Sequence, residues 1–462
     1  MVSLLIKNGL IITVDKNRRI IKDGAIAIDN NKIVDVGKTD AIEKKYSAEK
    51  IIDAKGNIVM PGLINTHVHI WQELGKGLGT DVELYTWLNT AWRLLQENMN
   101  SQDYYNAIRI GALEAIKTGT TTVLAYEHAL NAHPEALDDV VRALKESKVR
   151  SLLAIGWQDY GLEMGLPPVA YRETDEVLKF LNNAFKKYHN PSDDMFKIWV
   201  APSTTTFCTK ESLVEAKKIA DENKVGVTIH TNETKTSVEH SIKLHGVPEI
   251  EYLYNIGILD RNVVTVHSVW ASDKEIELLA KTGASVSHNP VSNMYLASGI
   301  APISKMLKSG VIVGLATDGP TSNNNMDMFD VIRVTPLLQK VGTLDPKSLT
   351  AEQTIEMATI GGAKSVLLES KLGSIEVGKL ADIIIVDIHN PRALPMANPV
   401  ANLVYSASSG NVITTIVNGE VLMENRKVLI MNEEEVLNNA QKSLERILAR
   451  AGVESVGQWK IE

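Results

Sequence analysis

The spacing of hydrophobic and polar residues divides this chain into three segments. Residues 1–59 carry short β-branched runs separated by turn residues, which is typical of an antiparallel β module. Between residues 60 and 370, apolar runs alternate with amphipathic stretches, the pattern of parallel βα units. After residue 370 short strands return, followed by a last helix that begins near Asn432 and ends near Gly452. The expected strands of the two end segments are residues 4–6, 10–14, 25–28, 32–36, 51–59, 381–386 and 412–417, with a hairpin turn at 29–31.

The middle segment contains eight apolar runs of strand length, and eight parallel strands with intervening helices close a (β/α)8 barrel. Two of the expected helices begin with capping boxes, Ser272 to Glu275 and Thr350 to Gln353. The sequence therefore predicts an α/β fold, with a TIM barrel at 60–370 and a small β-sandwich formed by residues 1–59 and 371–462. The expected barrel strands are the run that leads to His67 and residues 121–124, 150–155, 196–201, 225–230, 263–267, 284–288 and 311–316.

Four of these runs end on residues that bind metal ions or move protons. They lead to His67 and His69, to His230, to His267 and to Asp318. Side chains alternate along a strand, so the first two histidines point to the same side and can bind one ion together. Each histidine alone would more often be a hydrogen-bonded core residue, and the aspartate alone a turn residue. Barrel enzymes build their active sites at the carboxyl ends of strands, so the joint pattern predicts one site.

These residue types also indicate the metal and its chemistry. Imidazoles with a carboxylate suit zinc or ferrous iron better than magnesium or calcium. The fourth strand ends without a lysine that could bridge a second ion, so we expect one divalent ion, zinc, with ferrous iron as the alternative. Such an ion lowers the pKa of bound water to about 7. Asp318 can accept the proton of that water, Glu233 can pass protons to the substrate, and His267 orients the water or, less favoured, completes the coordination.

Composition excludes several other classes of protein. The chain has 462 residues, 44% of them hydrophobic and 23% charged, which is enough to build a large core. A net charge of −8 without a clustered Lys/Arg surface argues against a nucleic-acid partner. We find no apolar run long enough for a membrane span or a signal peptide. The single cysteine, Cys208, excludes an internal disulfide framework, so we expect a cytoplasmic enzyme.

Five longer motifs surround the candidate site residues. They are Pro-Gly-Leu-Ile-Asn-Thr-His67-Val-His69, His230-Thr-Asn-Glu233, Val-His267-Ser-Val-Trp, Ser-His288-Asn-Pro-Val-Ser-Asn and Ala-Thr-Asp318-Gly-Pro-Thr-Ser. These motifs resemble the amidohydrolase superfamily, in particular its branch of metal-dependent deaminases and chlorohydrolases, and the similarity covers nearly the whole chain. The resemblance implies a metal held by His67, His69, His230 and Asp318, with Glu233 and His267 as proton carriers. It also implies that water replaces an amino group on an aromatic N-heterocycle.

Departures within this branch bear on the substrate. Adenosylhomocysteine deaminases carry a glutamate where Gln96 stands and a Gly-Arg where this chain has Gly156-Trp157. Loss of that arginine weakens binding of an amino-acid carboxylate. Gln96 instead resembles melamine deaminase and atrazine chlorohydrolase, whereas His288-Asn-Pro follows the nucleoside-deaminase form. The residues expected to contact substrate are Gln72, Trp87, Gln96, His288 and Ser322.

Three classes of function remain open at this point. The favoured one is deamination of a small N-heterocycle, either an adenosine derivative such as methylthioadenosine or S-adenosylhomocysteine, or an s-triazine, with release of ammonia. The second is hydrolytic dehalogenation or cyclic-amide hydrolysis of the atrazine chlorohydrolase type. The third is a non-catalytic scaffold, against which the complete set of ligands argues. By resemblance alone we also expect a homo-oligomer, either a dimer or a tetramer.

Overall fold

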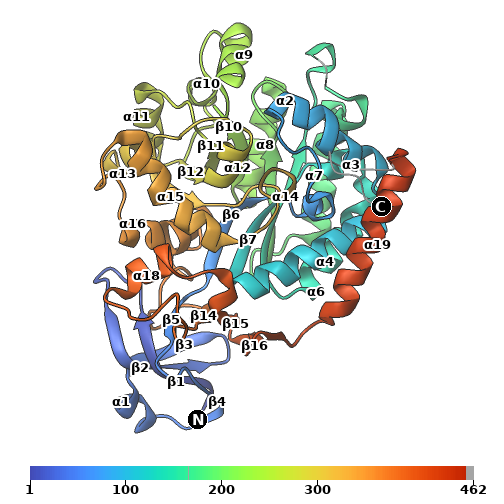
Figure 1. Ribbon diagram of the computed structural model, residues 1–462. Coiled ribbons are helices and arrows are strands. Elements are labelled where there is room, and N and C mark those ends of the chain that lie inside the picture. Colours follow the sequence, from blue (N-terminus) through green and yellow to red (C-terminus); the bar gives the residue numbers. More distant parts are fainter. Residues whose placement is uncertain (165, 454–462) are drawn as a thin grey trace.

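The computed structural model describes residues 1–164 and 166–453, and it contains two β-sheets (Figure 1). One is an eight-stranded parallel sheet in which the strands follow one another in chain order from β6 to β13. Each of the eight expected barrel strands is present, so the predicted barrel is confirmed. The strands are β6 (Leu63–Val68), β7 (Thr120–Glu127), β8 (Arg150–Trp157), β9 (Phe196–Pro202), β10 (Val227–Thr231), β11 (Val263–His267), β12 (Ser285–His288) and β13 (Ile312–Leu315).

Side-chain and loop hydrogen bonds join the first and last strands of this sheet. Asn65 Nδ2 donates to Thr317 Oγ1 at 2.7 Å, and both groups are buried. The backbone N–H of Asp318 donates to the carbonyl of His67 at 3.1 Å. The barrel therefore closes beside two expected site residues, His67 near the end of β6 and Asp318 just after β13.

Helices cover the outside of the barrel (Figure 1). The expected capping boxes are confirmed: Ser272 and Glu275 open α11, and Thr350 and Gln353 open α16. These side chains satisfy N–H groups that have no partner inside their helices. The main helices are α3 (Arg93–Asn98), α4 (Ser101–Thr118), α6 (Leu137–Glu146), α7 (Thr174–Tyr188), α8 (Lys210–Glu222), α9 (Lys235–His245), α10 (Glu249–Asn255), α11 (Asp273–Thr282), α12 (Pro290–Tyr295), α13 (Ile303–Lys308), α15 (Met328–Thr343) and α16 (Ala351–Glu356).

The second sheet combines both ends of the chain. Its nine strands run in the order β17-β16-β15-β14-β5-β1-β2-β3, with β4 beside β1. Strands from both ends contribute buried side chains to one apolar cluster, among them Ile26 and Ile28 from β2 and Ile383 and Ile385 from β14. The strands are β1 (Val2–Ile12), β2 (Ile20–Asp29), β3 (Lys32–Lys38), β4 (Ala48–Asp53), β5 (Ile58–Pro61), β14 (Ile383–Val386), β15 (Val412–Val417), β16 (Glu420–Glu424) and β17 (Lys427–Val428).

Several strand boundaries differ from the sequence prediction. The expected strands 4–6 and 10–14 form one strand, β1, because its pairing with β2 shifts register around Gly9 without breaking. The expected strand 51–59 is two strands, β4 and β5, separated by a turn in which Lys55 has φ 52°. β16 and β17 were not predicted, since such short strands give little periodic signal.

The last helix leaves the end sheet and packs against the barrel. α19 (Glu433–Ala451) begins after the expected cap residue Asn432, ends at Gly452, and contacts α4 (Figure 1). A buried ion pair also links the sheets: the Arg150 guanidinium donates to both carboxylate oxygens of Asp382, at 2.8 and 3.1 Å. The predicted domain boundaries, 60–370 against 1–59 with 371–462, stay a prediction, and residues 454–462 lie outside the described residues. Among the helices that the structure describes, none combines the length and apolarity needed to cross a bilayer.

Candidate metal centre and active site

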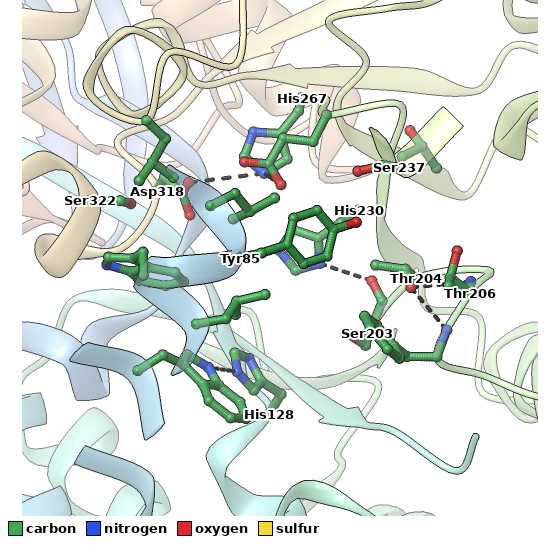
Figure 2. Close-up of a pocket in the computed structure, with 18 of the residues that line it drawn as sticks. Tyr85, His128, Ser203, Thr204, Thr206, His230, Ser237, His267, Asp318 and Ser322 are labelled. Carbon is green, nitrogen blue, oxygen red and sulfur yellow. Dashed lines mark hydrogen bonds and ion pairs between the residues drawn. The ribbon is translucent and has the colours of Figure 1, made fainter. Parts of the chain in front are cut away.

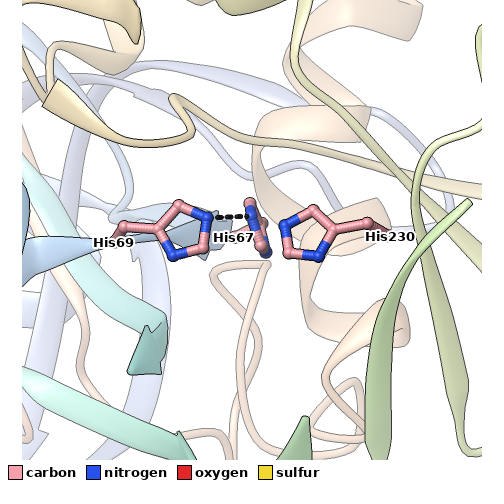
Figure 3. Close-up of side chains that lie close together, drawn as sticks. All are labelled: His67, His69 and His230. Atoms are coloured by element: carbon pink, nitrogen blue, oxygen red, sulfur yellow. Dashed lines mark hydrogen bonds between the residues drawn. The ribbon is translucent and has the colours of Figure 1, made fainter. Parts of the chain in front are cut away.

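Three histidines from two strands face one another at the carboxyl end of the barrel (Figure 3). His67 and His69 come from the end of β6, and His230 comes from β10. One ring nitrogen of each lies within 4.8 Å of the others, and Nε2 of His67 is 3.2 Å from Nε2 of His69. Burial lowers the pKa of all three imidazoles, to about 3 for His69. The rings are therefore neutral, which is the form that binds a metal ion.

Backbone carbonyls fix the outer nitrogens of two of these rings. His69 Nδ1 donates to the carbonyl of Tyr126 at 2.9 Å, and His230 Nδ1 donates to the carbonyl of Ser203 at 2.9 Å. Because a carbonyl only accepts, Nδ1 carries the proton in each neutral ring and Nε2 keeps its lone pair. Metal-binding histidines are commonly held in this way. The donor set therefore fits a divalent metal ion.

Asp318 adds a carboxylate to the same group. Its Oδ1 atom lies 3.4 Å from Nε2 of both His67 and His69, and its Oδ2 atom accepts a hydrogen bond from Ser292 Oγ at 2.7 Å. Burial acts to raise the pKa of Asp318, but the hydrogen bond from His67 and the neighbouring imidazoles hold it well below its usual range. The carboxylate is therefore charged and faces the three histidines.

His267 lies beside Asp318, Glu233 and the three histidines, with its ring stacked on that of His230 at 5.5 Å between centroids. His267 Nε2 is 3.6 Å from Glu233 Oε2 and 3.9 Å from Asp318 Oδ2. Its second nitrogen, Nδ1, lies 2.9 Å from the side-chain oxygen of Asn293 on α12, which fixes the ring. Burial raises the pKa of Glu233, so this carboxyl holds a proton to higher pH than an exposed glutamate. The two side chains are placed to exchange protons with a molecule beside Asp318.

The backbone adopts left-handed conformations at three positions of this site. The φ angles are 48° at Asn232, 67° at His267 and 63° at Asp318. Such conformations are costly for residues other than glycine, although less so for asparagine and aspartate, and they persist where the surroundings hold them. At Asn232 the surroundings are two buried glutamates: Glu249 accepts its backbone N–H at 2.5 Å, and Glu275 accepts from its side-chain amide at 3.0 and 3.1 Å. Asn232 thus fixes the turn between His230 and Glu233.

A cavity adjoins these groups and exposes them to a small molecule (Figure 2). In the view of Figure 2, Asp318 and Ser322 lie on one side and Thr204 and Thr206 on the other, with Tyr85 between them. The candidate metal ligands and proton carriers in its wall are His69, His230, Glu233, His267 and Asp318. Its aromatic wall is formed by Tyr85, Trp87, Trp92 and Phe207. The cavity therefore combines a polar end with flat apolar walls, which suits a heterocyclic ring.

Two of the five expected substrate residues line this cavity. They are Trp87 and Ser322. Nε1 of Trp87 donates to the carbonyl of Thr321 at 3.1 Å. The hydroxyl oxygens of Ser322 and Ser292 are 3.0 Å apart. The other three are Gln72, Gln96 and His288, which are buried outside the cavity wall.

The buried positions of these three have separate causes. Gln72 faces the loop after β13, where its Oε1 atom accepts from Thr321 Oγ1 at 2.5 Å. Gln96 lies on α3 with its side chain buried, and its backbone carbonyl accepts a hydrogen bond from His133 Nε2 at 2.6 Å. His288 is enclosed at the end of β12, where burial lowers its pKa to about 3. None of the three has an exposed face toward the cavity.

Several lining residues were missed by the sequence analysis. Tyr85, Trp92 and Phe207 come from helical turns and loops between strands, where an aromatic residue gives the same signal as core packing. Glu249 begins α10 and looks like an ordinary helix-start charge, yet it lines the cavity. His128 also lines the cavity, with its ring stacked on Trp92, whose Nε1 donates to His128 Nε2.

Comparisons with known proteins identify a family, relatives and a solved structure that this chain resembles. The sequence profile of the amidohydrolase family matches residues 58–422. The 5'-deoxyadenosine deaminase of Methanobrevibacter smithii is 38% identical over 446 residues, which are 96% of this chain and 98% of the relative. The 5-methylthioadenosine/S-adenosylhomocysteine deaminase of Thermococcus sibiricus is 38% identical over 423 residues, 91% of this chain and 94% of the relative. A solved adenosine deaminase from Xanthomonas campestris with bound zinc superposes with a TM-score of 0.90 at 26% identity, covering 97% of this chain and 99% of that structure.

The resemblance stated from the motifs is thus confirmed. The match to the family covers most of the chain, including the barrel and strands on both sides of it. The three-histidine group fits the metal site that this metal-dependent family requires. The chain belongs to the amidohydrolase family.

Proposed function

We propose that this protein is a metal-dependent deaminase of adenosine-type nucleosides. As a member of its family it is a hydrolase that acts on C–N bonds other than peptide bonds. The observation that carries the proposal is that Glu233, His267 and Asp318 face one cavity beside three neutral histidines, in a chain whose relatives bear names of adenosine-derivative deaminases. Flat aromatic walls in the same cavity support a ring as the reacting group.

His67, His69, His230 and Asp318 would hold one divalent ion. We propose zinc, which suits imidazole and carboxylate ligands and is named in the solved adenosine deaminase, with ferrous iron as the alternative. When bound, the ion supplies Lewis acidity and lowers the pKa of water toward neutrality. His267 lies outside the three-histidine group and acts as an orienting residue.

The residues of the chain would then move the protons. Asp318 accepts a proton from water as its oxygen attacks the ring carbon that bears the amino group. Glu233, with its raised pKa, donates a proton to the adjacent ring nitrogen. As the C–N bond breaks, the leaving amino group takes the proton that Asp318 accepted and departs as ammonia, the hydroxyl proton returns to Glu233, and the ring carbon keeps the oxygen. His267, held by Asn293, orients the water between the two carboxylates.

The test measures ammonia release by zinc-loaded protein from adenosine, 5'-deoxyadenosine, methylthioadenosine, guanine, cytosine and melamine, with chloride release from atrazine alongside. We expect ammonia from the adenosine-type substrates and a loss of about 10²–10⁴-fold in kcat for Glu233→Gln with unchanged metal content. Glu239→Gln is the matched control, because Glu239 is exposed on α9 outside the cavity.

Either of two results would overturn the proposal. Chloride from atrazine without ammonia from any substrate would identify a dehalogenase, the alternative expected from the resemblance. No turnover of the whole panel at one bound zinc per chain would exclude adenosine-type deamination. The cytoplasmic location and the homo-oligomeric state stay predictions, which fractionation and light scattering can check.

A further inference from the structure

A second compartment continues the active-site cavity away from the three histidines. The residues that line both are Tyr85, Leu88, Trp92, Gln158, Thr206 and Phe207. Beyond these shared residues the outer compartment is bounded by the short helical segment η2 (Leu88–Trp92) that continues α2 (Leu84–Trp87), by the loop after β8, and by α9. The outer compartment therefore offers space into which the rest of a substrate can extend when its ring lies beside Asp318.

The walls of the outer compartment are apolar or neutral. Leu88, Leu166, Pro167 and Phe207 provide apolar surface, while Asn89 and Gln158 provide neutral amides. His240 of α9 contributes an imidazole, whose Nδ1 atom lies 3.3 Å from the hydroxyl of Tyr85. Within the described residues, neither compartment is lined by a lysine or an arginine.

The inner cavity, in contrast, carries acidic groups. Glu233, Glu249 and Asp318 all line it. An anionic substituent on the substrate would enter a partly desolvated space with these carboxyl groups nearby and without a cationic partner. Buried charges without a partner are strongly disfavoured, and recognition of carboxylates or phosphates ordinarily uses arginine or lysine.

We propose that the outer compartment selects nucleosides whose 5' end is uncharged, and that it discriminates against nucleotides and against nucleosides bearing an amino acid. This inference rests on the proposed function and specifies its substrate class. Specificity of this kind arises because the wrong substrate leaves a charge unpaired, and the correct substrate gains only apolar contact and neutral hydrogen bonds. The selecting residues are Leu88, Asn89, Gln158, Leu166 and Phe207.

The test compares kcat/KM at pH 8 for two sets of adenine nucleosides. Adenosine, 5'-deoxyadenosine and methylthioadenosine have uncharged 5' ends, whereas AMP and S-adenosylhomocysteine carry a phosphate and an amino acid. We expect kcat/KM of the best uncharged substrate to exceed that of both charged substrates by at least about 10-fold, which is the effect of one missing hydrogen bond to a charged group.

If kcat/KM of the best uncharged substrate exceeded that of AMP or of S-adenosylhomocysteine by less than about 10-fold, the inference would be overturned while deamination stayed intact. Ammonia from none of the five would refute the proposed function itself, and the inference with it. The two failures are therefore distinguishable.

A gain-of-function variant tests whether the outer compartment is the place of discrimination. Asn89→Arg puts a guanidinium on its wall at an exposed helical position, where folding should tolerate it. We expect the ratio of kcat/KM for 5'-deoxyadenosine to kcat/KM for AMP to fall by about 10-fold in this variant. The matched control is Thr90→Arg, which adds the same charge at the next exposed residue outside the compartment. An unchanged ratio for Asn89→Arg, or an equal change for Thr90→Arg, would show that the compartment does not receive the 5' end.

Discussion

Substitution of Asn232 separates the two ways in which this residue holds the turn between His230 and Glu233. Its side-chain amide donates to both oxygens of buried Glu275, at 3.0 and 3.1 Å, and hydrogen bonds to charged groups contribute about 1.5–3 kcal/mol. Its φ angle is 48°, and placing alanine in a left-handed conformation costs about 1–2 kcal/mol more than placing glycine there. Asn232→Gly should therefore lose about 1.5–3 kcal/mol of unfolding free energy, and Asn232→Ala about 2.5–5 kcal/mol.

Activity should fall in both variants, because the same turn carries Glu233 to the cavity. A shift of about 1 Å in a catalytic group commonly costs about 100-fold in rate, so we expect kcat to drop by about 10- to 100-fold. The assays are urea unfolding of the zinc-loaded protein and steady-state ammonia release. The matched control is Asn425, an exposed asparagine with φ 51° in the turn between β16 and β17. Asn425→Ala should lose only the strain cost of about 1–2 kcal/mol, with unchanged kcat.

The outcomes divide the reasoning into its parts. Equal stability of the alanine and glycine variants at position 232 would refute the strain argument. Full stability of both would refute the hydrogen-bond argument. Loss of stability with full activity would show that the turn does not position Glu233.

Three further predictions follow from other parts of the molecule. Arg150→Met should lower the unfolding free energy by about 3–5 kcal/mol, because it leaves the buried carboxylate of Asp382 without its partner. Adding Asp382→Leu should recover most of this loss. Equal unfolding free energies for the single and the double variant would contradict the prediction. Chelation of the metal should abolish activity and lower the melting temperature in calorimetry, since a ligand at 1,000 times its Kd contributes about 4 kcal/mol, and added zinc should restore both. Burial raises the pKa of Glu249 from 4.5 to about 8, so the folded protein keeps a proton that the unfolded chain releases. Stability should therefore fall as the pH rises from 4.5 to about 8, and Glu249→Gln should flatten this slope in unfolding experiments between those values; an unchanged slope would contradict the assignment.

The sequence by itself determined the barrel and the residues that gather at its centre. Eight apolar runs of strand length alternate with capped helices, and both signals are local. In a parallel barrel the carboxyl ends of all strands meet at one face. The positions of His67, His230 and Asp318 along their strands were therefore enough to predict that they lie together, although they are far apart in the chain.

Only the tertiary structure decided which side chains line the cavity. Gln72 and Gln96 were expected to contact substrate, but the first faces the loop after β13 and the second is enclosed on α3. Tyr85 and Phe207 line the cavity without a distinguishing signal in the sequence. A hydrophobic pattern reports which face of an element is buried, and it is the same for a residue packed in a core and for one packed beside a cavity. The difference depends on the loops that meet there from separate parts of the chain.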